Sequence, residues 1–199
     1  MKISDKDDIR ILEQKVKKYR GIDFKTEEDY IKYKNNILDY EDLDFISSRY
    51  YGSHEYNDFI LRYMDDISKL SFEEKFKLFK GLYTSAKNTK LIGDLIQTLV
   101  EDKEIPEYEY KLIKENFTPI VYRGFNGLNL PDGCSFTTDI EKAKWFSNRF
   151  RCFGKEGYVI KININIDDVI FYYNGRDENE VFIRRKSLKN INREIIEEV

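Results

Sequence analysis

Cysteine and histidine are almost absent from this 199-residue sequence, which contains two Cys and one His. Cys134 and Cys152 are too far apart for a Cys-x-x-Cys pair, and His54 is the single imidazole. A structural zinc site takes about four ligands, chiefly Cys and His, so a Cys/His-rich metal site is excluded. Two Cys do not make a disulfide scaffold in a chain of this size and are typical of a reducing compartment. A Cys–His nucleophile pair stays formally open, although core packing is the commoner role of such cysteines.

The sequence also lacks long apolar runs. A membrane-spanning helix needs about 18 or more predominantly apolar residues in succession, and the longest apolar runs here are much shorter. The segment from Met1 to Asp8 is rich in charge and has no apolar core of a signal peptide. We therefore expect a soluble, cytoplasmic protein without a membrane partner, which would need another route of delivery to act outside its own cell.

Neither sign of charge predominates, because 34 Lys and Arg face 37 Asp and Glu, for a formal net charge of −3. A dedicated nucleic-acid binder carries a marked basic excess, so the composition does not support nucleic acid as partner or acceptor. The ten glycines form neither the Gly-x-Gly-x-x-Gly pattern nor the P-loop pattern, which excludes both nucleotide sites by motif. Aromatic residues are plentiful, with 15 Tyr and 14 Phe, and supply the core material that a disordered chain lacks.

Helical periodicity dominates the chain up to about residue 115. The segments in which apolar residues recur every three or four positions are 9–19, 30–38, 56–70 and 91–100. Ser71 to Glu74 has the pattern of a capping box, and Thr26 to Asp29 resembles another helix start. We expect the acidic segment Asp39 to Asp44 to be a solvated loop or a helix end.

Strand patterns replace the helical pattern after Thr118 and Pro119. The predicted strands are 120–122, 158–166, 169–173, 181–183 and 195–199, with one helix over 141–150. Helices followed by strands are typical of an α+β fold with a mainly antiparallel sheet. We predict a helical region over residues 1–117 and a β-rich region over residues 118–199, sharing one core.

Three short elements of the β-rich region are candidates for chemistry. They are Tyr122-Arg123-Gly124 at the end of a strand, Ser135-Phe136-Thr137-Thr138-Asp139 before a helix, and Glu178-Asn179-Glu180 entering a strand. Each alone has an ordinary explanation: a surface arginine, a helix cap and a pair of solvated carboxylates. Only the order of the three elements along the chain points beyond these ordinary explanations.

In that order the three elements resemble the Arg–Ser–Glu class of mono-ADP-ribosyltransferases. Ser135 to Thr138, followed by Ala143 and Trp145, is similar to the family's Ser-Thr-Ser strand and the helix after it. Glu178 to Ile183 is similar to its Glu-x-Glu loop and apolar strand. The upstream residues that resemble the family's N-terminal helices are Tyr51-Gly52-Ser53, Tyr56-Asn57 and Leu61-Arg62. The similarity is greatest to bacterial exoenzymes and to the enzymes of T-even phages.

The resemblance implies an ADP-ribosyltransferase fold, with a helical N-terminal part packed on a two-sheet antiparallel β-core and NAD bound as substrate, without a metal. The implied catalytic residues are Arg123, Ser135, Thr137, Glu178 and Glu180. The implied NAD-binding residues are Arg123, Gly124, Phe153, Lys155 and Tyr56, with Arg149 and Arg151 as alternatives for the basic position. The implied acceptor-binding residues are Tyr172, Tyr173 and Glu178, with Tyr51 on the nucleotide or acceptor side.

Each implied residue has a physical task. Loss of nicotinamide leaves an oxocarbenium-like ribose, which the carboxylate of Glu180 would stabilise. Ser135 and Thr137 would hydrogen-bond Glu180, although the positioning hydroxyl stays open between these two and Thr138. Glu178, two positions from Glu180, would lie on the same face of a strand and bind the acceptor guanidinium. The fork of Arg123 would hold a diphosphate oxygen or the ribose.

The predicted activity is the transfer of ADP-ribose from NAD to an arginine of a target protein, with release of nicotinamide. The arginine acceptor is implied by Glu-x-Glu in place of Gln-x-Glu. Such a protein would be a phage effector or a delivered toxin. The alternatives are an NAD glycohydrolase with the same site, in which water is the acceptor, and a non-catalytic binding or inhibitor protein on the same fold.

Overall fold

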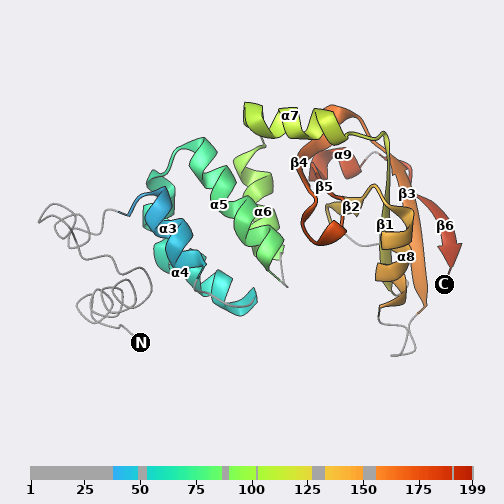
Figure 1. Ribbon diagram of the computed structural model, residues 1–199, viewed down its shortest axis with the longest axis horizontal. Coiled ribbons are helices and arrows are strands. Elements are labelled where there is room, and N and C mark those ends of the chain that lie inside the picture. The colour runs from blue at the N-terminus through green and yellow to red at the C-terminus, as the bar shows by residue number, and fades with distance from the viewer. Residues whose placement is uncertain are drawn as a thin grey trace, which may run out of the picture. The chain divides into compact units, whose positions relative to one another are not determined.

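The computed structural model describes residues 38–48, 53–86, 90–101, 103–126, 133–149, 156–189 and 191–198. The helix predicted over residues 9–19, the helix start at Thr26 to Asp29 and nearly all of the 30–38 segment lie outside these ranges. The chain divides into two compact units. One contains α3, α4 and α5 as far as Leu78, and the other contains Phe79–Ser85 of α5 and every element from α6 onward (Figure 1).

The first unit is helical, as the periodicity predicts. Its elements are α3 (Tyr40–Ser47), α4 (Ser53–Lys69) and the beginning of α5 (Phe72–Ser85). Asp39 and Asp42 form a reciprocal capping box, so the acidic segment is the start of α3. The capping box predicted for Ser71 and Glu74 is confirmed, with each backbone N–H donating to the partner's side chain. The largest side chains that are fully buried in this unit are Leu43, Phe59, Ile60, Ile67, Phe76 and Leu78.

The second unit combines helices with all the described strands. Its helices are α6 (Lys90–Leu99), α7 (Glu107–Asn116), α8 (Ile140–Asn148) and the single-turn α9 (Arg185–Leu188). Ile92 and Ile96 of the predicted 91–100 segment are buried in α6. The ring of Tyr83 in α5 lies 5.6 Å from that of Phe171 and 4.7 Å from that of Phe182. These contacts join the second part of α5 to β4 and β5, in agreement with its place in this unit.

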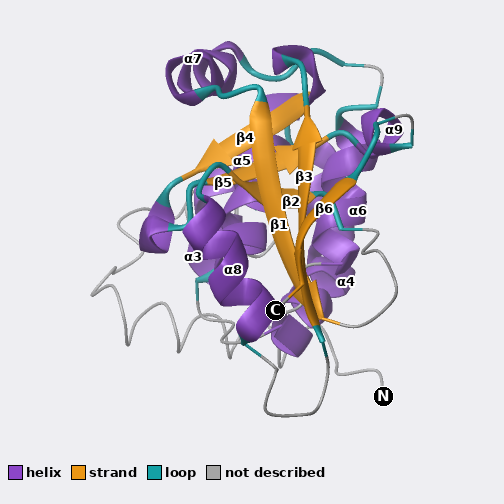
Figure 2. Ribbon diagram, turned by 90° about the vertical axis from the view of Figure 1, so that its right-hand side faces the viewer, coloured by secondary structure: helices purple, strands orange, loops and turns teal. Residues whose placement is uncertain are grey.

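The strands form one antiparallel sheet, which confirms the α+β class and the antiparallel arrangement (Figure 2). The strands are β1 (Ile120–Asn126), β2 (Ser135–Thr137), β3 (Gly157–Asn163), β4 (Val169–Tyr173), β5 (Glu180–Ile183) and β6 (Glu194–Glu198). Their order is β4-β5-β2-β1-β3-β6. All five strands predicted from the pattern are present, with β1 extended to Asn126.

The prediction of two sheets is wrong for the described strands. The β4-β5-β2 and β1-β3-β6 halves are joined through β1 and β2, whose register contains the single pair Tyr122 with Thr137. In contrast, β1 and β3 pair over seven positions, from Ile120 with Asn163 to Asn126 with Gly157. The three-residue β2 is long enough to hydrogen-bond both neighbours, so the two halves form a continuous sheet with a narrow junction.

The strand predicted over residues 158–166 ends earlier, at Asn163. Ile164 N donates to Pro119 O, and Asn165 N donates to the Asp168 side chain, which starts the 3-10 turn Ile166–Asp168. The apolar alternation therefore continues beyond the strand because Ile164 is still buried, although the chain turns into the 3-10 turn directly after it.

Glycine allows α8 to approach the β1-β3 half of the sheet. A Cβ on Gly124 would lie 1.8 Å from Ala143 O and 2.7 Å from Ser147 N, both backbone atoms of α8. A Cβ on Gly157 would collide with the backbone of Ser147 as well. Figure 2 shows α8 running alongside β1. Among the helices within the described ranges, none has the length and apolar character needed to cross a membrane.

Candidate functional site

Three adjacent strands of the sheet carry the three sequence elements. Arg123 is in β1, Ser135 and Thr137 are in β2, and Glu180 begins β5. Because the strand order is β5-β2-β1 in this part of the sheet, residues that are up to 57 positions apart in the sequence become neighbours. The register places Thr137 opposite both Tyr122 and Glu180. The narrow junction of the sheet is thus the place where the elements meet.

Ser135 is the common partner of the other two residues. Its hydroxyl donates to Glu180 Oε1, and its carbonyl oxygen accepts from Arg123 Nη1 at 2.5 Å. The predicted contact between Ser135 and Glu180 is therefore present. Of the three hydroxyls that the sequence left open, the structure brings Ser135 to this carboxylate, and the hydrogen bond restricts the rotamer of Glu180.

Arg123 is held in a tight environment. Its guanidinium lies 5.9 Å from the centre of the Phe136 ring, and a Cβ on Gly133 would come within 2.6 Å of Arg123 Cζ. Burial lowers the pKa of Arg123, whereas Tyr83, Cys134 and Glu180 oppose that shift. A guanidinium stays protonated in proteins, so the site keeps a fixed positive charge next to the Glu180 carboxylate.

One nitrogen of Arg123 has no hydrogen-bond partner among the described residues. Nε is buried, and within the described part of the chain nothing accepts its hydrogen. Buried polar groups are nearly always paired, and an exception calls for an explanation such as an unplaced water or ligand. A cationic donor of this kind fits a site that holds an anion.

The Glu-x-Glu segment is a turn that leads into β5. Asp177 and Asn179 have positive φ angles of 55° and 45°, and Glu178 between them has α-helical angles. The expectation that Glu178 and Glu180 share one face of a strand is therefore wrong, because Glu178 precedes the strand. Left-handed φ angles are tolerated best by Gly, Asn and Asp, which accounts for the residue types at 177 and 179.

Thr137 at the end of β2 and Thr138 directly after it hold this turn through its backbone. Thr137 Oγ1 donates to Glu178 O at 2.7 Å, and Thr138 N donates to Asn179 O at 3.1 Å. Thr137 was expected to hydrogen-bond the side chain of Glu180, but it bonds the main chain of Glu178 instead. The same hydroxyl accepts from Asp139 N, and Asp139 caps α8 as the sequence predicts.

Tyr172 and Tyr173 end β4 beside the turn. Tyr172 is only 8% exposed, and its hydroxyl donates to Asn179 Oδ1 at 2.8 Å. Tyr173 is part-exposed and pairs with Glu180 across the strands. Of the two predicted acceptor-binding tyrosines, Tyr173 is thus the one with surface to offer a ligand.

Several predicted residues are placed elsewhere or lie outside the described ranges. The close approach at Gly124 is made by α8, whereas a ligand was expected there. Arg149 ends α8, with its guanidinium 5.4 Å from the centre of the Trp145 ring. Tyr56 is buried in α4 of the first unit, and its role stays a prediction. The predicted residues outside the described ranges are Tyr51, Arg151, Phe153 and Lys155.

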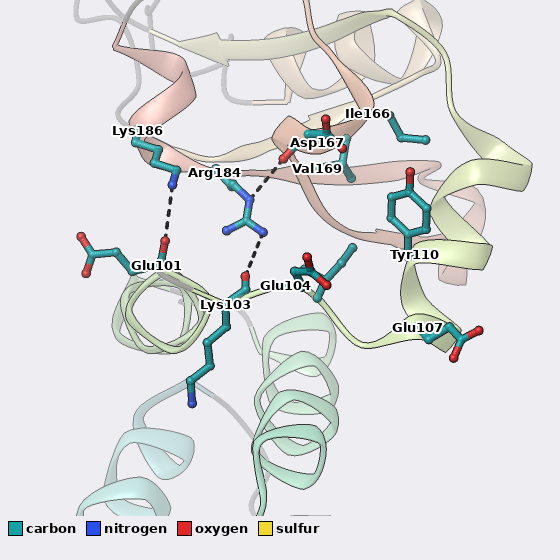
Figure 3. Close-up of a pocket in the computed structure, with 11 residues that line it drawn as sticks. Glu101, Lys103, Glu104, Glu107, Tyr110, Ile166, Asp167, Val169, Arg184 and Lys186 are labelled. Carbon is teal, nitrogen blue, oxygen red and sulfur yellow. Dashed lines mark hydrogen bonds between the residues drawn. The ribbon is translucent and has the colours of Figure 1, made fainter.

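A pocket of about 990 Å³ lies beyond the other end of β4 and β5 (Figure 3). Arg184, directly after β5, crosses it and donates to Val100 O, Lys103 O and Asp167 O. Since all three bonds are to backbone carbonyls, Arg184 joins the segment after α6 to the sheet. None of the predicted site residues lines this pocket, and within the described ranges no group of three or more His, Cys, Asp or Glu side chains is arranged to hold a metal ion.

Sequence patterns alone did not indicate Gly133, Asn179 or Glu109. Glu109 is 1% exposed, accepts from Lys80 Nζ at 2.7 Å and also accepts from Tyr172 N. Its position on an apolar face of α7, next to Ile113, was a usable signal, because a buried carboxylate has to be paired.

Comparison with known proteins identifies no relative, since no family model, curated protein or solved structure matches the chain.

Proposed function

We propose that this protein is a mono-ADP-ribosyltransferase that transfers ADP-ribose from NAD to an arginine of a target protein. The observation that carries the proposal is Ser135 on the central strand, with its hydroxyl bonded to Glu180 and its carbonyl bonded to Arg123. A hydroxyl that fixes a carboxylate beside a buried arginine suits a reaction in which positive charge develops on a ribose that carries a diphosphate.

The bond to be broken joins nicotinamide to the ribose of NAD. As nicotinamide leaves with the bonding electron pair, the ribose acquires oxocarbenium character, and a fixed carboxylate stabilises that charge in the transition state. Ser135 restricts Glu180 to one orientation, so less reorganisation is needed during the reaction. In this proposal Glu180 binds the ribose and stabilises the cation.

Arg123 is assigned to the diphosphate of NAD. A guanidinium presents several donors in a fixed planar fork that matches phosphate oxygens. Its Nη1 is held by Ser135 O, while its buried Nε has no acceptor among the described residues. A bound anion would satisfy the remaining hydrogen-bonding capacity and compensate the burial of the charge.

Glu178 is assigned to the acceptor. An arginine side chain is protonated at ordinary pH and is a poor nucleophile until a carboxylate binds it and accepts a proton. The attack forms a bond between a guanidinium nitrogen and C1′ of the ribose, and the displaced nicotinamide departs neutral. The proton lost from the guanidinium passes to Glu178 and then to solvent.

The test is to incubate the protein with labelled NAD and cell lysate, and to measure both nicotinamide release and label on protein. We expect transfer by the wild type and loss of both signals in Glu180→Gln, which keeps the shape of the side chain and removes its charge. Glu194→Gln is the matched control, since Glu194 is 61% exposed on β6 and pairs with Lys161.

Glu178→Gln separates transfer from hydrolysis. It should abolish protein labelling and leave nicotinamide release, because only the acceptor step depends on Glu178. Nicotinamide release without any protein adduct from the wild type would identify an NAD glycohydrolase. Labelling that continues undiminished in Glu180→Gln, or no consumption of NAD at all, contradicts the proposal.

A further inference from the structure

We infer that Tyr172 is a positioning residue whose hydroxyl holds the Asn179 turn, and that it thereby sets Glu178 relative to Glu180. The expected effect on catalysis rests on the proposed function, whereas the structural role of Tyr172 rests only on its hydrogen bonds. Tyr172 was expected to bind the acceptor. Its 8% exposure and its hydrogen bond to Asn179 Oδ1 indicate a different task.

Asn179 lies between Glu178 and Glu180 in the sequence and has an unusual backbone angle. Its φ of 45° lies in the left-handed region, which L-residues other than Gly visit at a cost in free energy. Asn tolerates this region because its short amide can hydrogen-bond nearby groups. Here the bond comes from Tyr172 at 2.8 Å, so the hydroxyl stabilises the conformation that turns the chain between Glu178 and Glu180.

Tyr172 itself has a rigid support. It belongs to the edge strand β4, and its backbone N–H donates to Glu109 Oε1 of α7 at 3.1 Å. Glu109 is held in turn by Lys80 of α5, at 2.8 Å from Oε1 and 2.7 Å from Oε2. An ion pair between the partly exposed Lys80 and the buried Glu109 thus fixes the end of β4, and Tyr172 extends that support to the turn.

The two carboxylates differ in how they are held. Glu180 lies in β5 and has Ser135 as a separate anchor. Glu178 lies on the far side of Asn179 from β5, and its main chain is held at the carbonyl by Thr137. Loss of the Tyr172 hydroxyl should therefore displace Glu178 more than Glu180. In the proposed reaction this affects transfer to the acceptor more than cleavage of NAD.

The test is Tyr172→Phe, which removes only the hydroxyl. With agmatine as the guanidine acceptor, we expect transfer to fall about tenfold, since one hydrogen bond is lost, while nicotinamide release in the absence of agmatine changes less than about twofold. In an Asn179→Ala background, Tyr172→Phe should have no further effect, because both changes remove the same interaction. Losses that add would show that Tyr172 does not act through Asn179.

Tyr158→Phe is the matched control. Tyr158 is also 8% exposed, and its hydroxyl donates to the side chain of Glu156 at 2.5 Å. It should leave the ratio of transfer to hydrolysis unchanged. An equal fall of transfer and hydrolysis in Tyr172→Phe, or additive losses with Asn179→Ala, overturns the inference.

Hydrogen exchange tests the geometry without reference to activity. Peptides that span residues 174–180 should exchange faster in Tyr172→Phe than in the wild type, and those from β3 and β6 should not. If the wild type consumes no NAD, the proposed function fails, and exchange alone decides the inference. Unchanged exchange over 174–180 refutes the role of Tyr172 even in an active enzyme.

Discussion

Replacement of Gly124 by alanine tests the packing that supports β1. The new Cβ would meet Ala143 O at 1.8 Å, Ala143 C at 2.9 Å and Ser147 N at 2.7 Å. An ordinary contact is about 3.4 Å or longer, so strand and helix must separate by roughly 1.5 Å. All three atoms are backbone, and no side-chain rotation relieves the overlap. Overpacking of this kind costs about 3 kcal/mol, which lowers the unfolding midpoint by roughly 6–12 °C.

Gly81→Ala is the matched control with the opposite sign. Gly81 is exposed within α5, belongs to the same compact unit and has nothing within 4 Å of a Cβ. Alanine restricts the unfolded chain and favours the helix, so it should stabilise the protein by about 1 kcal/mol. The same Gly→Ala substitution is therefore expected to destabilise the protein at position 124 and to stabilise it at position 81.

Urea unfolding of the wild type and both variants measures the two effects. The single Trp of the chain, Trp145, lies in α8, so its fluorescence reports on the helix that Gly124→Ala displaces, and circular dichroism reports on the whole chain. A Gly124→Ala protein within about 0.5 kcal/mol of the wild type would refute the close contact between β1 and α8. Destabilisation by Gly81→Ala would refute the reasoning about glycine.

Three further predictions concern stability and reactivity. Asp139→Ala should lower the free energy of unfolding by about 1 kcal/mol in urea titration, because its side chain caps α8 through Glu141 N and Lys142 N; Asp139→Asn should retain most of it. Lys80→Met should cost about 3–5 kcal/mol, since it leaves the buried Glu109 without its cation, and a loss below about 1 kcal/mol would show that the carboxylate is solvated. Burial raises the pKa of the Cys134 thiol, so its contribution to stability is complete below the unfolded pKa of about 8.5 and is lost as the pH rises through the folded value. In a Cys152→Ser protein, iodoacetamide at pH 8 should therefore label Cys134 far more slowly than in urea, and equal rates would contradict its burial.

Local sequence signals predicted the secondary structure of the β-rich region well. The alternation of Ile160 and Ile162 with polar residues predicted β3, and Asp139 was predicted as the N-cap of α8. These signals depend on neighbours within a few positions, where periodicity and capping act. They were less accurate at the end of β3, where the apolar alternation runs on to Ile166 but Asn165 and Asp168 form a capping box that starts a 3-10 turn.

The candidate site, too, was predicted in part from the sequence and decided in part by the tertiary structure. The sequence by itself determined which residues carry charge and hydroxyl groups, in the order Arg123, Ser135 and Glu180, and that order indicated a function. Only the tertiary structure decided that Ser135, rather than Thr137, bonds Glu180, and that Glu178 precedes the strand on which it was expected. The physical reason is that hydrogen-bond partners across β2 depend on strand register and on the left-handed turn at Asn179, which no spacing along the chain specifies.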